Sequence, residues 1–165
     1  MSDSVTDTTI ITNTADFLID TLTTSIADPV TNRTAKVPNS QFVTMKYAGV
    51  PLLYPCITVH IANVTSGPAL GAQTEAHVYQ ITAEIEVYAK KTPSRADTLA
   101  QTILNTIRTF HYGTDSAISK NLWNPVVLSV VPIVEEIDMK AGGFEKIHRR
   151  IITVRYQYTS GGGQS

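Results

Sequence analysis

The sequence predicts an α+β fold in which an antiparallel or mixed β-sheet carries two amphipathic helices on one face. Apolar and polar residues alternate strictly from residue 79 to 89, which is the period of a half-buried strand. Directly afterwards, residues 93–110 place apolar side chains at helical spacing. The expected elements follow the order α-β-β-β-α-β-β, without the strand–helix–strand repeats of a parallel sheet. Together these patterns favour helices packed against one side of a sheet.

The N-terminal third is predicted to hold the first helix and a short strand. Residues 1–13 are rich in Thr, Ser and Asp without periodicity, which is typical of a flexible arm. Apolar residues then follow helical spacing from Ala15 to Ile26, and Asp28-Pro29 ends this helix. Residues 29–40 indicate a loop, and residues 41–47 indicate a short strand.

The rest of the chain is predicted to form two hairpins that flank the second helix. Residues 56–64 alternate like a strand, and the polar stretch TSGPALGAQTE at 65–75 connects them to the strand at 79–89. The last two strands are expected at 125–139 and 144–158. The glycine pair between them suits a hairpin turn that needs positive φ.

Length and composition limit the number of domains and the kinds of partner that the chain can have. A chain of 165 residues suits one domain, which we expect over residues 14–158, followed by a flexible Gly/Ser tail at 159–165. The net charge of -1 and the pI of about 6.4 leave no basic patch for nucleic-acid phosphates. The longest apolar run, residues 126–134, is shorter than the about 20 residues that span a bilayer, and the N-terminus has no basic leader. We expect no membrane contact and a protein that stays where it is made.

Two glutamates are the strongest candidates for chemistry. Glu84 and Glu86 are the only carboxylate pair that sequence spacing places on one strand face, where it could act as acid and base or hold a cation. The strict alternation around them favours a charged, solvated sheet face instead. On that expectation they pair across strands with Arg149 and Arg155, which share one face of the last strand. These four residues are predicted to be sheet-face or subunit-interface charges.

No other pattern supports catalysis, cofactor binding or metal binding. Metal ligation would draw on residues that lack a partner at short spacing, namely His60, His77, His111, His148 and Cys56. His60 and His77 flank the same polar stretch, but two imidazoles do not complete a zinc site. The glycines match neither the dinucleotide-binding nor the phosphate-loop pattern. We predict no catalytic residue, no cofactor, no metal and no enzymatic activity.

Six segments together resemble a known family of viral proteins. They are an amphipathic N-terminal helix, YPCITVHI, a long polar hairpin loop, AEIEVYAK, SRADTLAQTILNTI and RRIITVRYQY. In content and order, over residues 14–158, they are similar to the tail terminator, or tail completion, proteins of long-tailed phages and related viruses. The resemblance implies a homohexameric ring that caps the tail tube, stops tube polymerisation and docks the head connector, a stopper or adaptor protein. It also implies a virion protein at the neck, the upper end of the tail, made in the host cytoplasm, with DNA contact limited to passage through the ring.

The polar stretch supplies a candidate contact surface for such a ring. Flexible loops suit contacts above and below a ring, so we expect the hairpin tip to contact the tube. Its candidate tube-contact residues are Ser66, Gly67, Pro68, Leu70, Gly71 and Gln73. A head–tail stopper or adaptor, another minor tail protein, or a tube subunit would show similar patterning. From other classes, the alternatives are a small ferredoxin-like binding or regulatory domain and an enzyme that uses Glu84 and Glu86.

Overall fold

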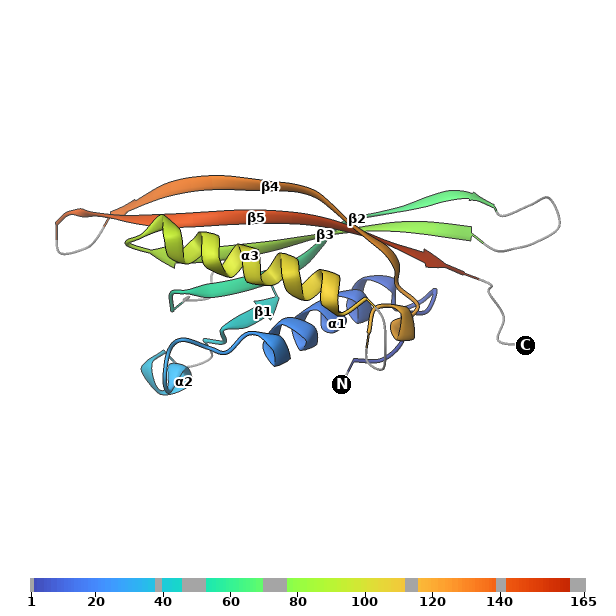
Figure 1. Ribbon diagram of the computed structural model, residues 1–165, viewed down its shortest axis with the longest axis horizontal. Helices are drawn as coiled ribbons and strands as arrows, with labels where there is room; N and C mark the ends of the chain where they lie inside the picture. The colour runs from blue at the N-terminus through green and yellow to red at the C-terminus, as the bar shows by residue number, and fades with distance from the viewer. Residues whose placement is uncertain are drawn as a thin grey trace.

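A computed structural model describes residues 2–37, 40–45, 53–69, 77–111, 116–138 and 142–160. Figure 1 shows one β-sheet with the helices on one side of it. The elements in chain order are α1 (Ile10–Ser25), α2 (Arg33–Lys36), β1 (Val43–Met45), β2 (Cys56–Ala69), β3 (His77–Lys90), α3 (Pro93–Thr109), the 3₁₀ helix η1 (Ile118–Lys120), β4 (Trp123–Asp138) and β5 (Phe144–Thr159). The predicted α+β class is confirmed.

The five-stranded sheet has the strand order β1-β2-β3-β5-β4. β1 runs parallel to β2 and the other neighbouring pairs are antiparallel, so the sheet is mixed. β3 is the third of the five strands in this order and is therefore the central strand. β4 is the last and is therefore an edge strand, with β5 between it and β3. The observed element order differs from the predicted one by two short helices, α2 and η1. A helix of three or four residues leaves no periodic signal in a sequence.

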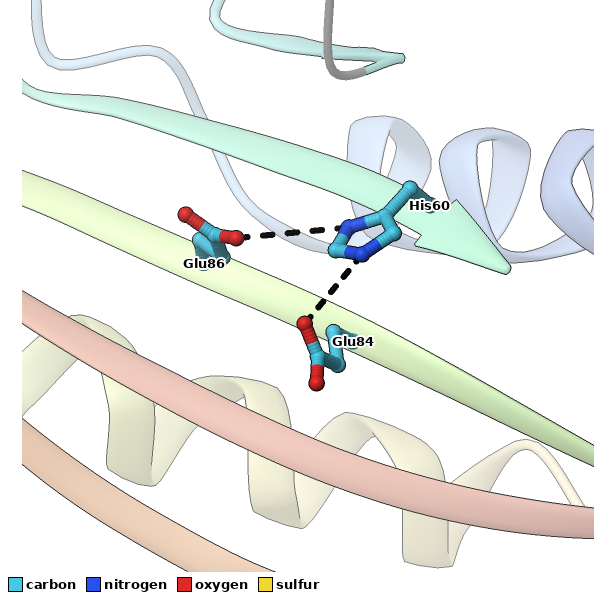
Figure 2. Close-up of side chains that lie close together, drawn as sticks. All are labelled: His60, Glu84 and Glu86. Carbon is cyan, nitrogen blue, oxygen red and sulfur yellow. Dashed lines mark ion pairs between the residues drawn. The ribbon is translucent and has the colours of Figure 1, made fainter. Parts of the chain in front are cut away.

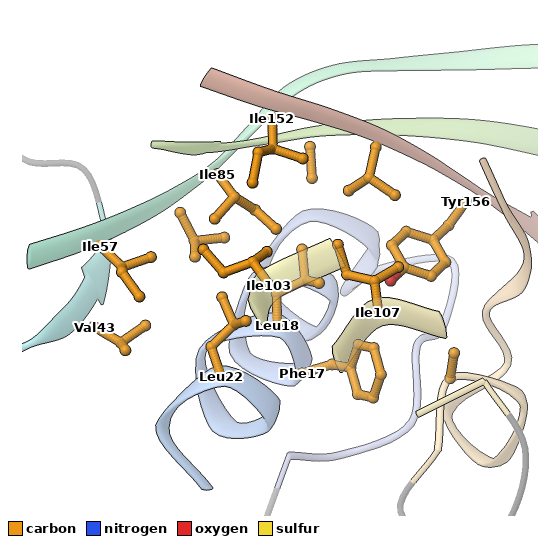
Figure 3. Packing of buried hydrophobic residues seen from close by; sticks show 14 of the residues in the cluster. Phe17, Leu18, Leu22, Val43, Ile57, Ile85, Ile103, Ile107, Ile152 and Tyr156 are labelled. Atoms are coloured by element: carbon orange, nitrogen blue, oxygen red, sulfur yellow. The ribbon is translucent and has the colours of Figure 1, made fainter. Parts of the chain in front are cut away.

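The apolar core lies between the sheet and the two long helices. α1 and α3 pack on the same sheet face (Figure 3), where Leu18, Ile85 and Ile103 are at most 1% exposed. Burial of each large aliphatic side chain contributes roughly 1.5–3 kcal/mol, which holds both helices on the sheet. The inward residues of β3 are the alternate ones predicted from the sequence, namely Ile81, Ala83, Ile85, Val87 and Ala89. Within the described ranges, no helix combines the length and the apolar character needed to cross a membrane.

The β2–β3 hairpin is longer than predicted, and part of its predicted loop is strand. β2 continues to Ala69, and its Ser66 pairs with Tyr79 of β3. The prediction of a loop over residues 65–75 is therefore wrong for its first part. The alternation of apolar and polar residues stops here, because both faces of the hairpin become polar. The backbone hydrogen bonds between the two strands do not depend on that alternation, so the strands continue to pair. In Figure 1 this hairpin extends beyond the ends of both long helices.

The N-terminal segment packs on the domain where a flexible arm is predicted. α1 begins at Ile10, inside the predicted arm at 1–13. Val5 is only 1% exposed, and its N–H donates to the carbonyl of Lys120 over 3.0 Å. A single apolar residue in a polar stretch has no period, so the sequence pattern does not indicate that it reaches the core.

The C-terminal segment is strand where the predicted flexible tail begins. β5 runs to Thr159, and the N–H of Ser160 donates to the carbonyl of His77. The N–H of His77 in turn donates to the Ser160 hydroxyl over 3.1 Å. These two bonds close the end of the β3–β5 ladder. The rest of the predicted tail, residues 161–165, lies outside the described residues.

Replacing Ile103 by alanine is expected to lower the free energy of unfolding by about 2–5 kcal/mol, because it leaves a cavity between α3 and the sheet. Urea denaturation followed by circular dichroism measures this loss. Gln101→Ala, on the exposed side of the same helix, is the matched control and should change the free energy by less than about 0.5 kcal/mol. Equal losses in the two variants would contradict the packing of α3 on the sheet.

Candidate functional site

A polar surface covers the sheet face that lies away from the helices. Because side chains alternate along a strand, the residues between the core positions of β2, β3 and β5 point away from the helices. His60 lies there on β2, Glu84 and Glu86 lie there on β3, and Arg149 lies there on β5. The two glutamates therefore occupy the face that the sequence alternation predicts.

Glu86 is the buried centre of this surface, with an exposed fraction of 0%. Its Oε2 lies 2.6 Å from Nη2 of Arg149 and accepts a hydrogen bond from the Tyr88 hydroxyl. Burial, together with the hydrogen bond to Glu86, raises the pKa of Tyr88 well above its usual value, so the phenol stays protonated and donates. Arg149 also lies 3.0 Å from Glu135 of β4, and its guanidinium stacks over the Tyr88 ring. The buried carboxylate is tolerated because it is paired and hydrogen-bonded.

One of the two predicted charge pairs forms, and the prediction of the other is wrong. Arg149 contacts Glu86, as the cross-strand expectation requires. Arg155 instead donates to the side-chain oxygen of Gln80 over 3.5 Å, and the register does not place it opposite Glu84. The alternation of each strand is unchanged by a shift of two residues, so it fixes the face of a residue without fixing its partner.

Glu84 has a different partner, His60 on the neighbouring strand (Figure 2). The two residues lie opposite each other in the register, and Nε2 of His60 lies 3.2 Å from Oε2 of Glu84. Nδ1 of the same imidazole lies 4.0 Å from Oε1 of Glu86. His77, the other histidine beside the polar stretch, lies opposite Ala69 and does not join this group.

His60, Glu84 and Glu86 therefore bring three potential metal ligands together, with one ligand atom of each within 4.8 Å of the others. The prediction of no metal site rests on spacing along the chain, and strand pairing brings residues together regardless of that spacing. A signal for the group was present in the sequence, because all three residues fall on the polar faces of their strands.

The structure describes part of the predicted tube-contact segment. Ser66 lies in β2 opposite Tyr79, so it belongs to the hairpin ladder. A Cβ at Gly67 would lie 3.0 Å from the carbonyl oxygen of Val78, which favours glycine at this position. Pro68 also falls within the bounds of β2. The remaining predicted contact residues, Leu70, Gly71 and Gln73, lie outside the described residues.

The edge strand β4 exposes apolar side chains on both of its faces. Val130 lies opposite the core residue Ile152 and so faces the helix side, whereas Val131 lies opposite Ile151 and faces the other side. Their side chains are nevertheless 41% and 44% exposed. We define the β4 edge patch as the exposed apolar residues of this strand: Trp123, Val126, Leu128, Val130, Val131 and Val134. The sequence shows the apolar run, but only the sheet order shows that it lies on an edge.

Two surface hollows lined by described residues lie away from the polar surface. The larger, about 510 Å³, lies between α1, α2 and β1. On its wall, buried Arg33 donates to both carboxylate oxygens of Asp28 and holds the pKa of that carboxyl below its usual value. The smaller, about 290 Å³, lies beside the start of α3. Neither hollow has Glu84 or Glu86 on its wall, so neither supports an enzyme that uses these carboxylates.

Comparison with known proteins adds no family to these observations. The chain matches no protein-family model and no curated protein. The geometry of the described residues and the resemblance in the sequence are therefore the two supports for a function.

Arg149→Met is expected to lower the free energy of unfolding by about 3–5 kcal/mol at neutral pH, because it removes the cationic partner of buried Glu86. Arg155→Met is the matched control on the same strand face. It removes a partly exposed cation whose hydrogen bond to Gln80 is 3.5 Å long, and it should cost less than about 1 kcal/mol. Urea unfolding of both variants measures the difference. Similar losses would show that Glu86 does not depend on Arg149.

Proposed function

We propose that this protein is a structural virion protein that forms a ring, caps the tail tube, ends tube polymerisation and provides the docking surface for the head connector. The observation that carries the proposal is the β4 edge patch, a row of exposed apolar side chains along an edge strand of 16 residues. The resemblance over residues 14–158 supplies the tube and the connector as partners and the neck of a virion as the location.

The β4 edge patch supports self-assembly because it is apolar on both faces of the strand. Strands with one face in water alternate between apolar and polar residues, whereas near-continuous apolar runs are typical of strands covered on both faces. A neighbouring subunit would bury the apolar side chains of β4 that are exposed in a single subunit. Pro132 has no N–H to donate, so we expect the neighbour to pack on side chains there and not to extend the sheet through this residue.

A closed ring joins two different surfaces of the same subunit. β4 lies at one edge of the sheet, and the other edge is formed by β1 and β2. β1 pairs with β2 only from Ile57 to Val59, so the later part of β2 is an open edge among the described residues. Contacts from the β4 edge of one subunit to the opposite edge of the next would run head to tail, as a ring requires.

The β2–β3 hairpin is the element that we propose contacts the tube. It extends beyond the helices (Figure 1), and β5 pairs with β3 as far as Val78, so the projection is supported along one side. Its exposed residues include Asn63, Thr65 and Ser66, which are polar. A supported polar projection suits contact with a second protein, because it does not drive association with copies of itself.

Ring formation is tested by light scattering of the purified protein and by electron micrographs of the protein mixed with tail tube subunits encoded by the same genome. We expect a closed oligomer of uniform mass and tubes of limited length with capped ends. The double variant Val131→Lys, Val134→Lys should be monomeric with an unchanged circular dichroism spectrum, since both side chains are already half exposed in one subunit. Gln101→Lys adds a cation on the exposed side of α3 and should still form the ring.

Three outcomes would favour another function over this proposal. A wild-type protein that is strictly monomeric and leaves tubes unchanged would favour the small ferredoxin-like binding domain. Binding to the head connector without binding to the tube would favour a stopper or adaptor. Polymerisation of the protein by itself would favour a tube subunit.

The tube contact is tested by shortening the hairpin. Replacing residues 67–78 with Asn-Gly joins Ser66 to Tyr79, which already pair, through a two-residue turn that strand twist favours. We expect this variant to form the ring but to leave tubes uncapped in electron micrographs. Capping at the wild-type level would show that the hairpin is not the contact element.

A further inference from the structure

Nitrogen and oxygen atoms that can bind a metal ion lie close together on the outer sheet face, which is the face away from the helices. His60, Glu84 and Glu86 come from two adjacent strands, and Figure 2 shows the imidazole lying between the two carboxylates. One imidazole and two carboxylates form a donor set that suits Zn²⁺, which in open sites takes three protein ligands and a water. The three side chains lie on the face opposite the apolar core, so they are available for a role other than packing.

A buried polar group beside these residues lacks a partner. Thr58 is 3% exposed, and its hydroxyl makes no hydrogen bond within the described part of the chain. Thr58 lies two residues before His60 and directly opposite Glu86, so its side chain points to the same place on the outer face. Nδ1 of His60 is also buried and makes no hydrogen bond to a described residue, since Oε1 of Glu86 lies 4.0 Å away. Because buried polar groups are nearly always paired, these two groups point to a ligand bound beside them.

Two carboxylates lie next to the imidazole of His60. Among the described residues, Glu84 pairs with His60, whereas Arg149 pairs with both Glu86 and Glu135. Arg155 lies on the same outer face opposite Thr82, and its side chain donates to Gln80. Arg149 contacts Oε2 of Glu86, whereas Oε1 of the same carboxylate is the oxygen nearer to His60. A cation beside the imidazole would be attracted by the carboxylates of Glu84 and Glu86, each of which has one oxygen near a nitrogen of His60.

We propose that His60, Glu84 and Glu86 bind a divalent transition-metal cation, with Zn²⁺ as the best match to the donors. Imidazole disfavours Mg²⁺ and Ca²⁺, which prefer oxygen ligands. His60 and Glu84 are partly exposed, so the cation can enter from solvent. A water that completes the coordination would give the Thr58 hydroxyl the hydrogen-bond partner that it lacks.

The place of the site in the hairpin gives the cation a structural role. The register of β2 and β3 shifts between Ile61 and Asn63, one residue beyond His60 along β2. Such a bulge bends a strand and increases its twist, so β2 changes direction here. A bound cation ties β2 to β3 beside this bend and holds the base of the projecting hairpin. This role does not rest on the proposed ring function.

The binding test is isothermal titration calorimetry of the untagged 165-residue chain, stripped with EDTA and then titrated with ZnCl₂. We expect one Zn²⁺ per chain with a dissociation constant in the micromolar range or tighter, and a higher thermal unfolding midpoint in excess Zn²⁺. MgCl₂ at the same concentration should leave the midpoint unchanged. An equal response to Mg²⁺ would overturn the assignment to a site that contains an imidazole.

Two ligand variants locate the site. His60→Gln and Glu84→Gln each remove a partly exposed ligand without touching the core, and each should weaken Zn²⁺ binding by about tenfold or more. His77→Gln, at an exposed histidine further along the hairpin, is the matched control and should bind Zn²⁺ like the wild type. Circular dichroism verifies that each variant is folded. Absence of Zn²⁺ binding by the wild type, or wild-type affinity in both ligand variants, would overturn the proposal and leave the ring proposal unaffected.

Discussion

β3 is the central strand, and the difference between its two faces constrains every element around it. Ile81 and Ile85 on one face are buried beneath the helices, while Glu84 and Glu86 on the other face meet partners from β2 and β5. A shift of one residue in the pairing would move both glutamates into the apolar core and the isoleucines out of it. Burying an unpaired ionised carboxylate costs far more than a single apolar contact contributes, so the alternative register is strongly disfavoured. The Glu86–Arg149 pair disfavours a two-residue shift of β5, because that shift would take the guanidinium away from the buried carboxylate.

The sequence predicted those parts of the fold whose signal lies within one segment. The alternation of β3 and the apolar stripe of α3 each extend over enough residues to be recognised without knowledge of their neighbours. The packing of Val5 has no such signal, because one apolar residue among polar ones has no period. The candidate site likewise could be predicted only as far as its signal lies within one segment. The sequence indicated the polar face of Glu84, but its contact with His60 depends on strand register, which involves two segments at once.

The apolar run at 126–134 shows how the meaning of a segment depends on its position in the sheet. In a central strand covered on both faces, the same residues would be an ordinary part of a core. At the edge they form an exposed surface that risks uncontrolled association. Pro132 interrupts the row of N–H donors, and Glu135 and Glu136 add charge near one end of the strand, so continuous strand addition is disfavoured. These features suit a neighbour that packs in one defined way, which a ring needs if it is to close.

The bulge after His60 connects the proposed assembly to the proposed cation site. A bulge redirects a strand, so the direction of the projecting hairpin relative to the core is set where the register shifts. In a ring, every subunit must present its projection in the same direction for the set of projections to meet a tube. In the proposed ring, the side chains beside the bend have to keep the hairpin in one direction. The ion pair between His60 of β2 and Glu84 of β3 contributes to this, and the proposed coordination bonds would add to it. A polar cluster is better placed for that task than an apolar one, because the outer face at this point is partly open to water and apolar packing there would be incomplete. The carboxylates that first suggested acid–base chemistry thus have a structural reason to lie where they do, beside the bend that sets the direction of the hairpin.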